Sequence, residues 1–250
     1  MASYIHDLLD RLREGFRARA ATGEAFVIGV AGGVAAGKTT FAEFLAASMR
    51  DWPEQPKAEI VSTDGFLLAN RVLAERDLSY RKGFPESYDT EGLVRAVSAL
   101  RAKRPTQIPV YSHVTYDVDR EAGRTIAGAD IAIIDGLHLR IAKNGPEGGR
   151  LIDRLLYLDA DEADLEHWFR TRLFPLMVAG RNDPKSFYHQ FRAMDDEAAH
   201  AFVSRVWEGI NLPNLREHIV KDRDAADVII RKVRDHSVSG LTVQPALQPR

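Results

Sequence analysis

The stretch that decides the fold is Gly32-Gly33-Val34-Ala35-Ala36-Gly37-Lys38-Thr39, which fits the pattern G-x-x-x-x-G-K-[ST] without a gap. Glycines let a backbone curl so that successive N–H groups point inward at phosphate oxygens. The alternative is a glycine-rich turn that binds nothing. At the ordinary glycine frequency, a chance match in a chain of this length arises in roughly one sequence in a hundred. The stretch therefore predicts a phosphate-binding loop.

The residues on either side of this loop give it the context that it needs. The run Phe26-Val27-Ile28-Gly29-Val30-Ala31 is typical of a buried strand, and residues 38–49 have the pattern of a helix, whose positive end would face the phosphates. In such loops the lysine reaches the β- and γ-phosphates and the Thr hydroxyl binds Mg²⁺. We therefore expect ATP and Mg²⁺ as cofactors, held by Gly32, Gly33, Val34, Ala35, Ala36, Gly37, Lys38, Thr39 and Thr40.

Further apolar runs alternate with helical patterns on both sides of the loop. The sequence predicts strands at residues 57–62, 130–135, 154–158 and, as the last one, 226–231, with a β-rich edge segment at 108–116. It predicts helices at residues 3–20, 90–103, 163–178 and 195–211. Continuous apolar strands between helices favour a parallel sheet covered on both faces. The expected fold class is α/β, the three-layer α/β/α arrangement of P-loop NTPases with a mostly parallel sheet.

Composition narrows the class of protein further. The 250 residues predict a single domain (1–250), with an N-terminal helix in residues 1–22 and a loose C-terminal tail in residues 237–250. The net charge of −2 gives no reason to expect a nucleic acid or a membrane surface as partner. No apolar run is long enough to span a membrane, and cysteine is absent. We therefore expect a cytoplasmic enzyme.

Three acids follow predicted strands and are candidates for chemistry. Asp135, before Gly136, could hold Mg²⁺, and Asp159 is its rival. Asp64 lies before Gly65 and could accept the proton of an attacking hydroxyl, although an Asp before a Gly is also a common turn. Ligands bind beyond the carboxyl ends of parallel strands. Asp64 and Asp135 would therefore share one edge with the loop.

Polar side chains gather in residues 111–117. On a strand, Tyr111, His113 and Thr115 share one face, and Ser112 and Tyr116 share the other. Buried hydroxyl and imidazole groups need hydrogen-bond partners, which a polar ligand could supply. The alternative is an edge strand with one solvated face.

Three arginines, Arg170, Arg172 and Arg181, lie in or after the predicted helix at residues 163–178. Arginine can clamp phosphates and offset the charge of a transition state. We expect one of the three to be catalytic, and their spacing does not say which.

At this point the chain resembles the bacterial type I pantothenate kinases, which are grouped with the uridine kinases and phosphoribulokinases. The similar segments span residues 26–236, and they are Gly32–Thr39, Thr63-Asp64-Gly65-Phe66, Lys82-Gly83-Phe84-Pro85-Glu86-Ser87-Tyr88-Asp89, Pro109-Val110-Tyr111-Ser112-His113, Tyr116-Asp117, Asp135-Gly136-Leu137 and Ile210-Asn211. The resemblance implies ATP-dependent phosphorylation of the hydroxyl of pantothenate, a step of coenzyme A biosynthesis, by a phosphotransferase that works as a homodimer.

The resemblance also implies roles for single residues. Asp64 would be the base, Lys38 would serve ATP, and Arg172 would match the arginine of the family's lid. Thr39 would serve Mg²⁺, for which Asp135 is the candidate acid named above, and Lys232 and His236 would lie near the adenine. The acceptor would meet Asp64, Tyr111, His113, Tyr116, His138, Phe169, Arg181, Tyr188 and Asn211.

Because some residues depart from the family pattern, the identity of the acceptor remains undecided. His138 replaces an amide, Phe169 replaces a tyrosine, and Arg181 replaces an aromatic residue of the lid. These changes would also suit a smaller or anionic acceptor, such as a sugar acid, sugar, sugar phosphate or nucleoside. Glu43 replaces a basic residue linked to coenzyme A binding, which argues against feedback inhibition by coenzyme A. A regulator that binds nucleotide without catalysis is the alternative from another class.

Overall fold

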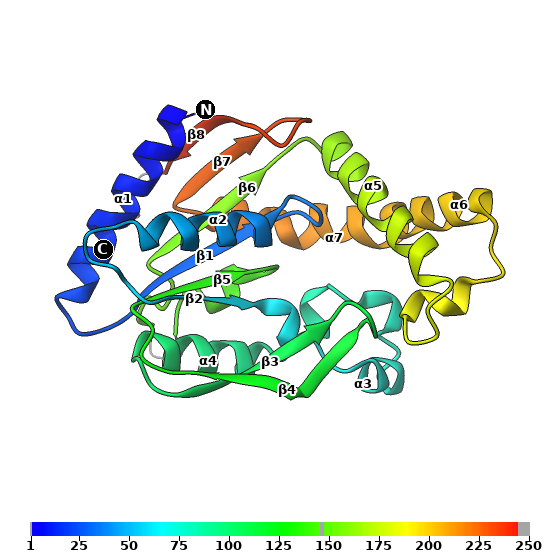
Figure 1. The fold of residues 1–250 in the computed structure, drawn as a ribbon, viewed down its shortest axis with the longest axis horizontal. Coiled ribbons are helices and arrows are strands. Elements are labelled where there is room, and N and C mark those ends of the chain that lie inside the picture. The colour runs from blue at the N-terminus through cyan, green and yellow to red at the C-terminus, as the bar shows by residue number, and fades with distance from the viewer. Residues whose placement is uncertain (1, 146–147, 245–250) are drawn as a thin grey trace.

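The computed structural model describes residues 2–145 and 148–244, and its centre is one six-stranded sheet (Figure 1). The apolar run before the phosphate loop forms β1 (Phe26–Gly32), in which every residue is buried. The strand order is β2-β5-β1-β6-β7-β8. The bounds of the other strands are Ala58–Ser62 for β2, Ile131–Asp135 for β5, Arg154–Asp159 for β6, Val228–Lys232 for β7 and Val238–Val243 for β8. Strands β1, β2, β5, β6 and β7 run parallel, which confirms the predicted fold class.

Helices cover both faces of this sheet (Figure 1). Helix α2 (Lys38–Arg50) packs on β1, β2 and β5, and α8 (Val220–Ala225) packs on β1 and β6. The N-terminal helix is α1 (Ala2–Ala20), and α4 (Thr90–Arg101) buries the apolar face that its helical spacing predicted. Both faces of the central strands are therefore covered, as their uninterrupted apolar sequence requires.

The C-terminal tail prediction was wrong for its first part. Residues 238–243 form β8, which pairs antiparallel with β7, so the strand at 226–231 is not the last one. The apolar residues of this segment, Val238, Leu241 and Val243, do not alternate strictly, and its backbone hydrogen bonds to β7 supply an order that side-chain patterning did not reveal. Residues 245–250 of the predicted tail lie outside the described residues.

The β-rich segment at 108–116 is also not one strand. β3 (Thr106–Ser112) ends in a turn, and β4 (Asp117–Ile126) returns antiparallel to it in a separate two-stranded ribbon. Tyr116 lies in the turn with a φ of 56°. Its ring therefore meets the ring of Tyr111, with centroids 5.9 Å apart, although strict alternation predicted opposite faces.

Three insertions lie on the side of the sheet where the parallel strands end (Figure 1). They are the β3–β4 ribbon, the short helix α3 (Asn70–Glu75) and the helical hairpin of α5 (Glu162–Gly180) and α6 (Asp196–Val206). The helix predicted at 195–211 continues past α6 as a π-helical turn, Trp207–Asn211, and then α7 (Leu212–Asn214).

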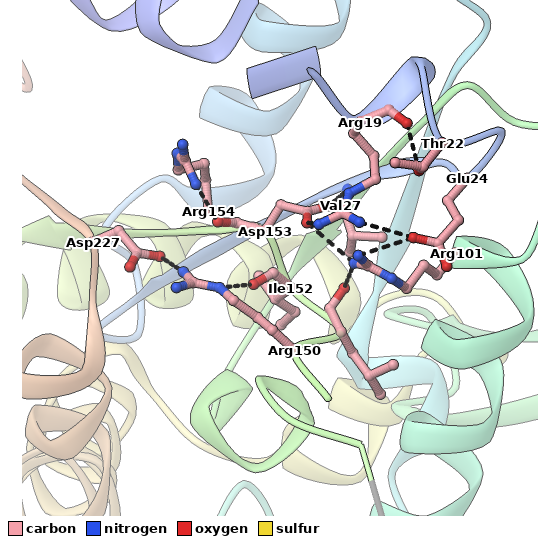
Figure 2. Close-up of polar contacts among 11 residues, drawn as sticks. Arg19, Thr22, Glu24, Val27, Arg101, Arg150, Ile152, Asp153, Arg154 and Asp227 are labelled. Atoms are coloured by element: carbon pink, nitrogen blue, oxygen red, sulfur yellow. Dashed lines mark hydrogen bonds and ion pairs between the residues drawn. The ribbon is translucent and has the colours of Figure 1, made fainter. Parts of the chain in front are cut away.

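The opposite edge of the sheet is fixed by an ionic cluster (Figure 2). The carboxylate of Asp153 is 4% exposed and accepts hydrogen bonds from the backbone N–H of Val27 at 2.9 Å, from Arg19 at 2.5 Å and from Arg101 at 3.2 Å. Because each partner comes from a different segment, the cluster ties α1, β1 and α4 to the start of β6. A buried carboxylate needs such partners to offset its desolvation.

Among the described residues, no helix combines the length and the apolar character required to cross a bilayer.

Candidate active site

The phosphate loop lies directly against β6. Gly32 has a φ of 150°, and a Cβ added there would come within 2.8 Å of the carbonyl oxygen of Leu158. Only glycine fits this close approach, because the neighbouring atom is backbone and cannot move aside. The loop then curls through Gly37 into α2, as its sequence predicted.

Lys38 lies folded onto its own loop. Its Nζ donates to the carbonyl oxygens of Gly32, at 3.1 Å, and of Gly33, at 2.9 Å. Burial lowers the pKa of Lys38, and the nearby carboxylates of Asp64 and Asp135 act in the opposite direction. A desolvated ammonium beside two acids is suited to attract a phosphate, whose oxygens are stronger acceptors than these carbonyls.

Asp135 and Thr39 meet at the start of α2. The Thr39 hydroxyl donates to Asp135 Oδ2 at 2.6 Å, and Asp135 Oδ1 is buried without a hydrogen-bond partner in the described residues. Burial raises the pKa of Asp135, while the hydrogen bond from Thr39 lowers it. Mg²⁺ prefers hard oxygen ligands and commonly takes one or two carboxylates together with phosphates. The orphaned oxygen and the adjacent hydroxyl therefore fit this metal.

The rival acid, Asp159, is engaged elsewhere. Its carboxylate pairs with Arg223 at 3.3 Å and with Arg231 at 3.1 Å. Because two arginines already offset its charge, Asp159 is poorly suited to bind a cation. Of the two acids, the structure brings Asp135 to the loop hydroxyl.

The lack of a side chain at Gly136 lets the turn that carries Asp64 pack close to Asp135. Gly136 has a φ of 152°, and a Cβ there would lie 1.7 Å from Thr63 Oγ1. The Thr63 hydroxyl instead accepts the backbone N–H of Leu137 at 3.1 Å. This approach sets the 3₁₀ turn Thr63–Phe66, which carries Asp64, against the end of β5. The two acids chosen from the sequence therefore lie at one edge with the loop.

Three tyrosines line the acceptor side of this site, and we call them the tyrosine wall or acceptor wall. Tyr111 and Tyr116 come from the β3–β4 ribbon, and Tyr188 comes from the hairpin of α5 and α6. Phe187 stacks on Tyr116 with centroids 4.6 Å apart, and its backbone N–H donates to the carbonyl oxygen of Val114. Burial raises the pKa of Tyr111 and Tyr116, and the charge of Asp64 raises both further. These phenols are therefore protonated and able to donate hydrogen bonds, and the charge of Asp64 acts on both.

Sequence reasoning gave no role to Lys82, which the structure brings into this wall. Its Nζ donates to Asn70 Oδ1 at 2.7 Å and to the carbonyl oxygen of Tyr116 at 2.5 Å. It lies 4.3 Å from the ring centroid of Tyr116 and 5.0 Å from that of Tyr111. Burial lowers its pKa to about 8, although Asp117 and Asp64 act to raise it. The motif K-G-F-P-E-S-Y-D contained this residue, but nothing in it indicated where the ammonium points.

His138 is buried, with 3% exposure, next to this wall. Its Nε2 lies 2.8 Å from the carbonyl oxygen of Gly83, and its ring meets Tyr88 edge-on. Burial lowers the pKa of His138 to about 4, so the ring is neutral near pH 7. A neutral ring bonded to a carbonyl donates through Nε2, so this nitrogen is already used. Contact between His138 and an acceptor stays a prediction.

The three arginines in or after α5 differ in their surroundings. Arg170 is held by Glu166, at 2.5 Å, and by the Ser204 hydroxyl. Burial raises the pKa of Tyr116 and Tyr188, and the charge of Arg172 acts in the opposite direction on both. Arg172 is exposed, and among the three it is the arginine whose charge acts on these two phenols; its catalytic role stays a prediction.

Arg181 is tied to the start of α6. Its guanidinium donates to Asp196 Oδ1 at 2.9 Å and to the carbonyl oxygen of Asp195 at 3.2 Å. These contacts hold the two helices of the hairpin together. The prediction that Arg181 touches the acceptor or a phosphate is not tested by this structure.

Lys232 and His236 flank an aromatic residue of α5. The ring of His236 stacks on Trp168 with centroids 4.2 Å apart, and Lys232 Nζ donates to the carbonyl oxygen of Ala36 in the phosphate loop at 2.7 Å. Lys232 thus contacts the phosphate loop, and His236 lies on the same tryptophan; their contact with the adenine stays a prediction. Trp168 joins them and was missed, because an aromatic residue on a helix reads as core.

Three further predicted residues come from three different segments. His113 is exposed and its ring lies 5.1 Å from that of Tyr111. Phe169 is buried against Trp207, and Asn211 ends the π-helical turn. Their contact with an acceptor stays a prediction.

Comparison with known proteins gives one family. Residues 27–170 match the model of the phosphoribulokinase / uridine kinase family. A pantothenate kinase of Sorangium cellulosum is 43% identical over 237 residues, which are 92% of this chain and 76% of that protein. A pantothenate kinase of Agrobacterium fabrum is 40% identical over 227 residues, 88% of this chain and 70% of that protein. The structure of D-glycerate 3-kinase from Cryptococcus neoformans aligns with a TM-score of 0.63 at 13% identity, over 96% of this chain and 99% of that one, and shares the fold.

Proposed function

The chain belongs to the phosphoribulokinase / uridine kinase family, and from this premise we propose that it transfers the γ-phosphoryl group of ATP to pantothenate, giving 4′-phosphopantothenate and ADP. The supporting observation is the meeting of three parts at one sheet edge: the phosphate loop, Asp64 and the tyrosine wall. The choice of pantothenate rests on relatives with that name at about 40% identity over most of the chain.

The mechanism that this geometry supports is in-line transfer. Asp64 accepts the proton of the acceptor hydroxyl while the hydroxyl oxygen bonds to the γ-phosphorus of ATP. At the same time, the bond between that phosphorus and the β,γ-bridging oxygen breaks. Lys38 and Arg172 offset the charge on the moving group. Thr39 and Asp135 would hold Mg²⁺, which supplies further positive charge at the phosphates. Tyr111 and Tyr116 orient the acceptor by donating hydrogen bonds.

The experiment that tests this proposal is an ADP-release assay over a panel of acceptors. The panel contains pantothenate, uridine, ribulose 5-phosphate, glycerate and four-carbon sugar acids. We expect pantothenate to give the highest kcat/KM. Turnover of another acceptor with none of pantothenate would overturn the choice of substrate while leaving the kinase chemistry in place.

The site also predicts a pH dependence through Lys82. Its pKa is lowered to about 8 by burial, so it carries its charge below pH 8 and loses it as the pH rises above that value. The groups that face it are Asp64, Asp117 and the phenols of Tyr111 and Tyr116. We expect kcat/KM for the acceptor to fall as the pH rises through about 8.

Two variants check this assignment. Lys82→Arg keeps the charge and should move the fall to a higher pH, because the guanidinium does not titrate in this range. Lys82→Met should lower kcat/KM at every pH. A fall near pH 8 that persists unchanged in Lys82→Arg would assign the titration to another group.

The proposal includes a cytoplasmic homodimer, which the family resemblance implies. Analytical ultracentrifugation gives the oligomeric state directly, and a monomer at all concentrations would remove that part alone.

A further inference from the structure

A buried acid behind the active site has no role in the mechanism above. Asp222 lies on α8 and has 0% exposure. Its Oδ2 accepts the backbone N–H of Leu139 at 3.1 Å, and its Oδ1 accepts that of Arg140 at 3.0 Å. Burial raises its pKa to about 6, so the group is ionised at pH 7. A buried charge is costly unless hydrogen bonds satisfy it, and here the donors are backbone groups of one short segment.

That segment follows the end of β5. The chain runs from Asp135 through Gly136 and Leu137 to His138, which has a φ of 60° and precedes the 3₁₀ turn Leu139–Ala142. A non-glycine residue in this left-handed conformation is unfavourable unless its surroundings hold it. The two N–H groups that follow it are those bound by Asp222. The carboxylate therefore holds the backbone in the shape that sets the direction of the His138 side chain.

The side chain of His138 carries this constraint to the acceptor wall. Its Nε2 donates to the carbonyl oxygen of Gly83, which also accepts Asn214 Nδ2 at 2.7 Å. Gly83 follows Lys82 directly, and has a φ of 94°. Two donors on this one carbonyl hold the Gly83–Phe84 peptide, which begins one residue after Lys82, whose side chain extends to Tyr116.

We propose that Asp222 is a positioning residue that does not itself touch the acceptor wall. Through the backbone of residues 138–140 and the side chain of His138, Asp222 sets the position of the Gly83 peptide and so of Lys82 in that wall. The effect on acceptor binding rests on the proposed function. The effect on the Gly83 peptide rests on the contacts alone.

The matched comparison is Asp153, a deeply buried carboxylate that lies away from the phosphate loop. It also binds backbone and is also inaccessible, but it lies at the opposite edge of the sheet. Asp222→Asn and Asp153→Asn should both lower the melting temperature. A role in positioning predicts that only Asp222→Asn changes the acceptor side. Asp224→Asn, an exposed residue of the same helix, is the neutral control.

The first measurement is hydrogen exchange of the free protein, which needs no substrate. We expect faster exchange in peptides that cover residues 82–88 and 138–142 of Asp222→Asn, with wild-type exchange there in Asp153→Asn. Unchanged exchange at residues 82–88 in Asp222→Asn would overturn the proposal, whatever acceptor the enzyme uses.

The second measurement is steady-state kinetics with pantothenate. We expect Asp222→Asn to raise the acceptor KM about tenfold, because losing a hydrogen bond to a charged group changes an equilibrium constant by about tenfold or more. The Kd of ATP should stay within about twofold. His138→Ala should have the same effect, and the double variant should be no worse than either single one, because the contacts form one chain. Multiplying effects, or an equal rise in Asp153→Asn, would contradict the proposal. If the wild-type protein does not turn over pantothenate, the proposed substrate is wrong, and the hydrogen-exchange result alone tests the positioning role of Asp222.

Discussion

Asp64→Asn removes turnover while ATP still binds. Asparagine has the same shape as aspartate but cannot accept the proton of the acceptor hydroxyl, and a positioned general base is worth about 10²- to 10⁴-fold in rate. The carboxylate lies on the turn Thr63–Phe66 and its charge reaches Lys38, Lys82, Tyr111 and Tyr116. We expect kcat to fall by at least about a hundredfold in the ADP-release assay.

The control for this variant is Asp119→Asn, an exposed residue of β4 in the adjoining ribbon. It should retain wild-type turnover. Calorimetry should give wild-type ATP affinity for Asp64→Asn, because the residue lies on the acceptor side of the transferred group. Normal kcat in Asp64→Asn would remove Asp64 as the base, and loss of ATP binding would point to a damaged loop instead.

Asp135→Asn separates nucleotide binding from its dependence on Mg²⁺. In the wild-type protein, Asp135 Oδ1 is buried without a partner and Oδ2 holds the Thr39 hydroxyl, so the pair is arranged for a cation. An amide has one oxygen and no charge. Changes around bound metals typically cost 10- to 100-fold in affinity, and loss of a charged ligand should cost about as much or more.

The measurement is the Kd of ATP by calorimetry with and without Mg²⁺. We expect the metal to strengthen ATP binding in the wild-type protein and to have little effect in Asp135→Asn. Asp159→Asn is the matched control, because this acid also ends a buried strand but pairs with Arg223 and Arg231. Equal Mg²⁺ dependence in Asp135→Asn and wild type would exclude Asp135 from the metal site.

The lid shows why some assignments need the folded chain. Arg170 and Arg172 are two residues apart on one helix, and helical spacing does not rank them. The structure separates them through residues distant in sequence: Ser204 holds Arg170, whereas Tyr116 and Tyr188 sense the charge of Arg172. The family resemblance chose Arg172 by position, and the surroundings supply a physical reason for that choice.

Lys82 and His138 show the same limit on the acceptor side. Lys82 reaches the carbonyl oxygen of Tyr116, 34 residues further along the chain. His138 was given a contact with substrate, and its Nε2 is bound to the carbonyl oxygen of Gly83, 55 residues earlier. A sequence pattern records what a residue could donate or accept, but not which distant carbonyl it meets.

The sequence by itself determined the parts that local forces control: the phosphate loop, the buried parallel strands on either side of it, and the placing of Asp64 and Asp135 at strand ends. Backbone conformation and apolar periodicity act within a single helix, strand or turn, so a short sequence pattern reveals them. Only the tertiary structure decided that Asp159 is neutralised, that the chain turns back between β3 and β4, and that Asp222 supports the 138–140 segment. Each of these depends on partners brought together by folding, and burial then fixes the charge and hydrogen bonding of the groups that meet.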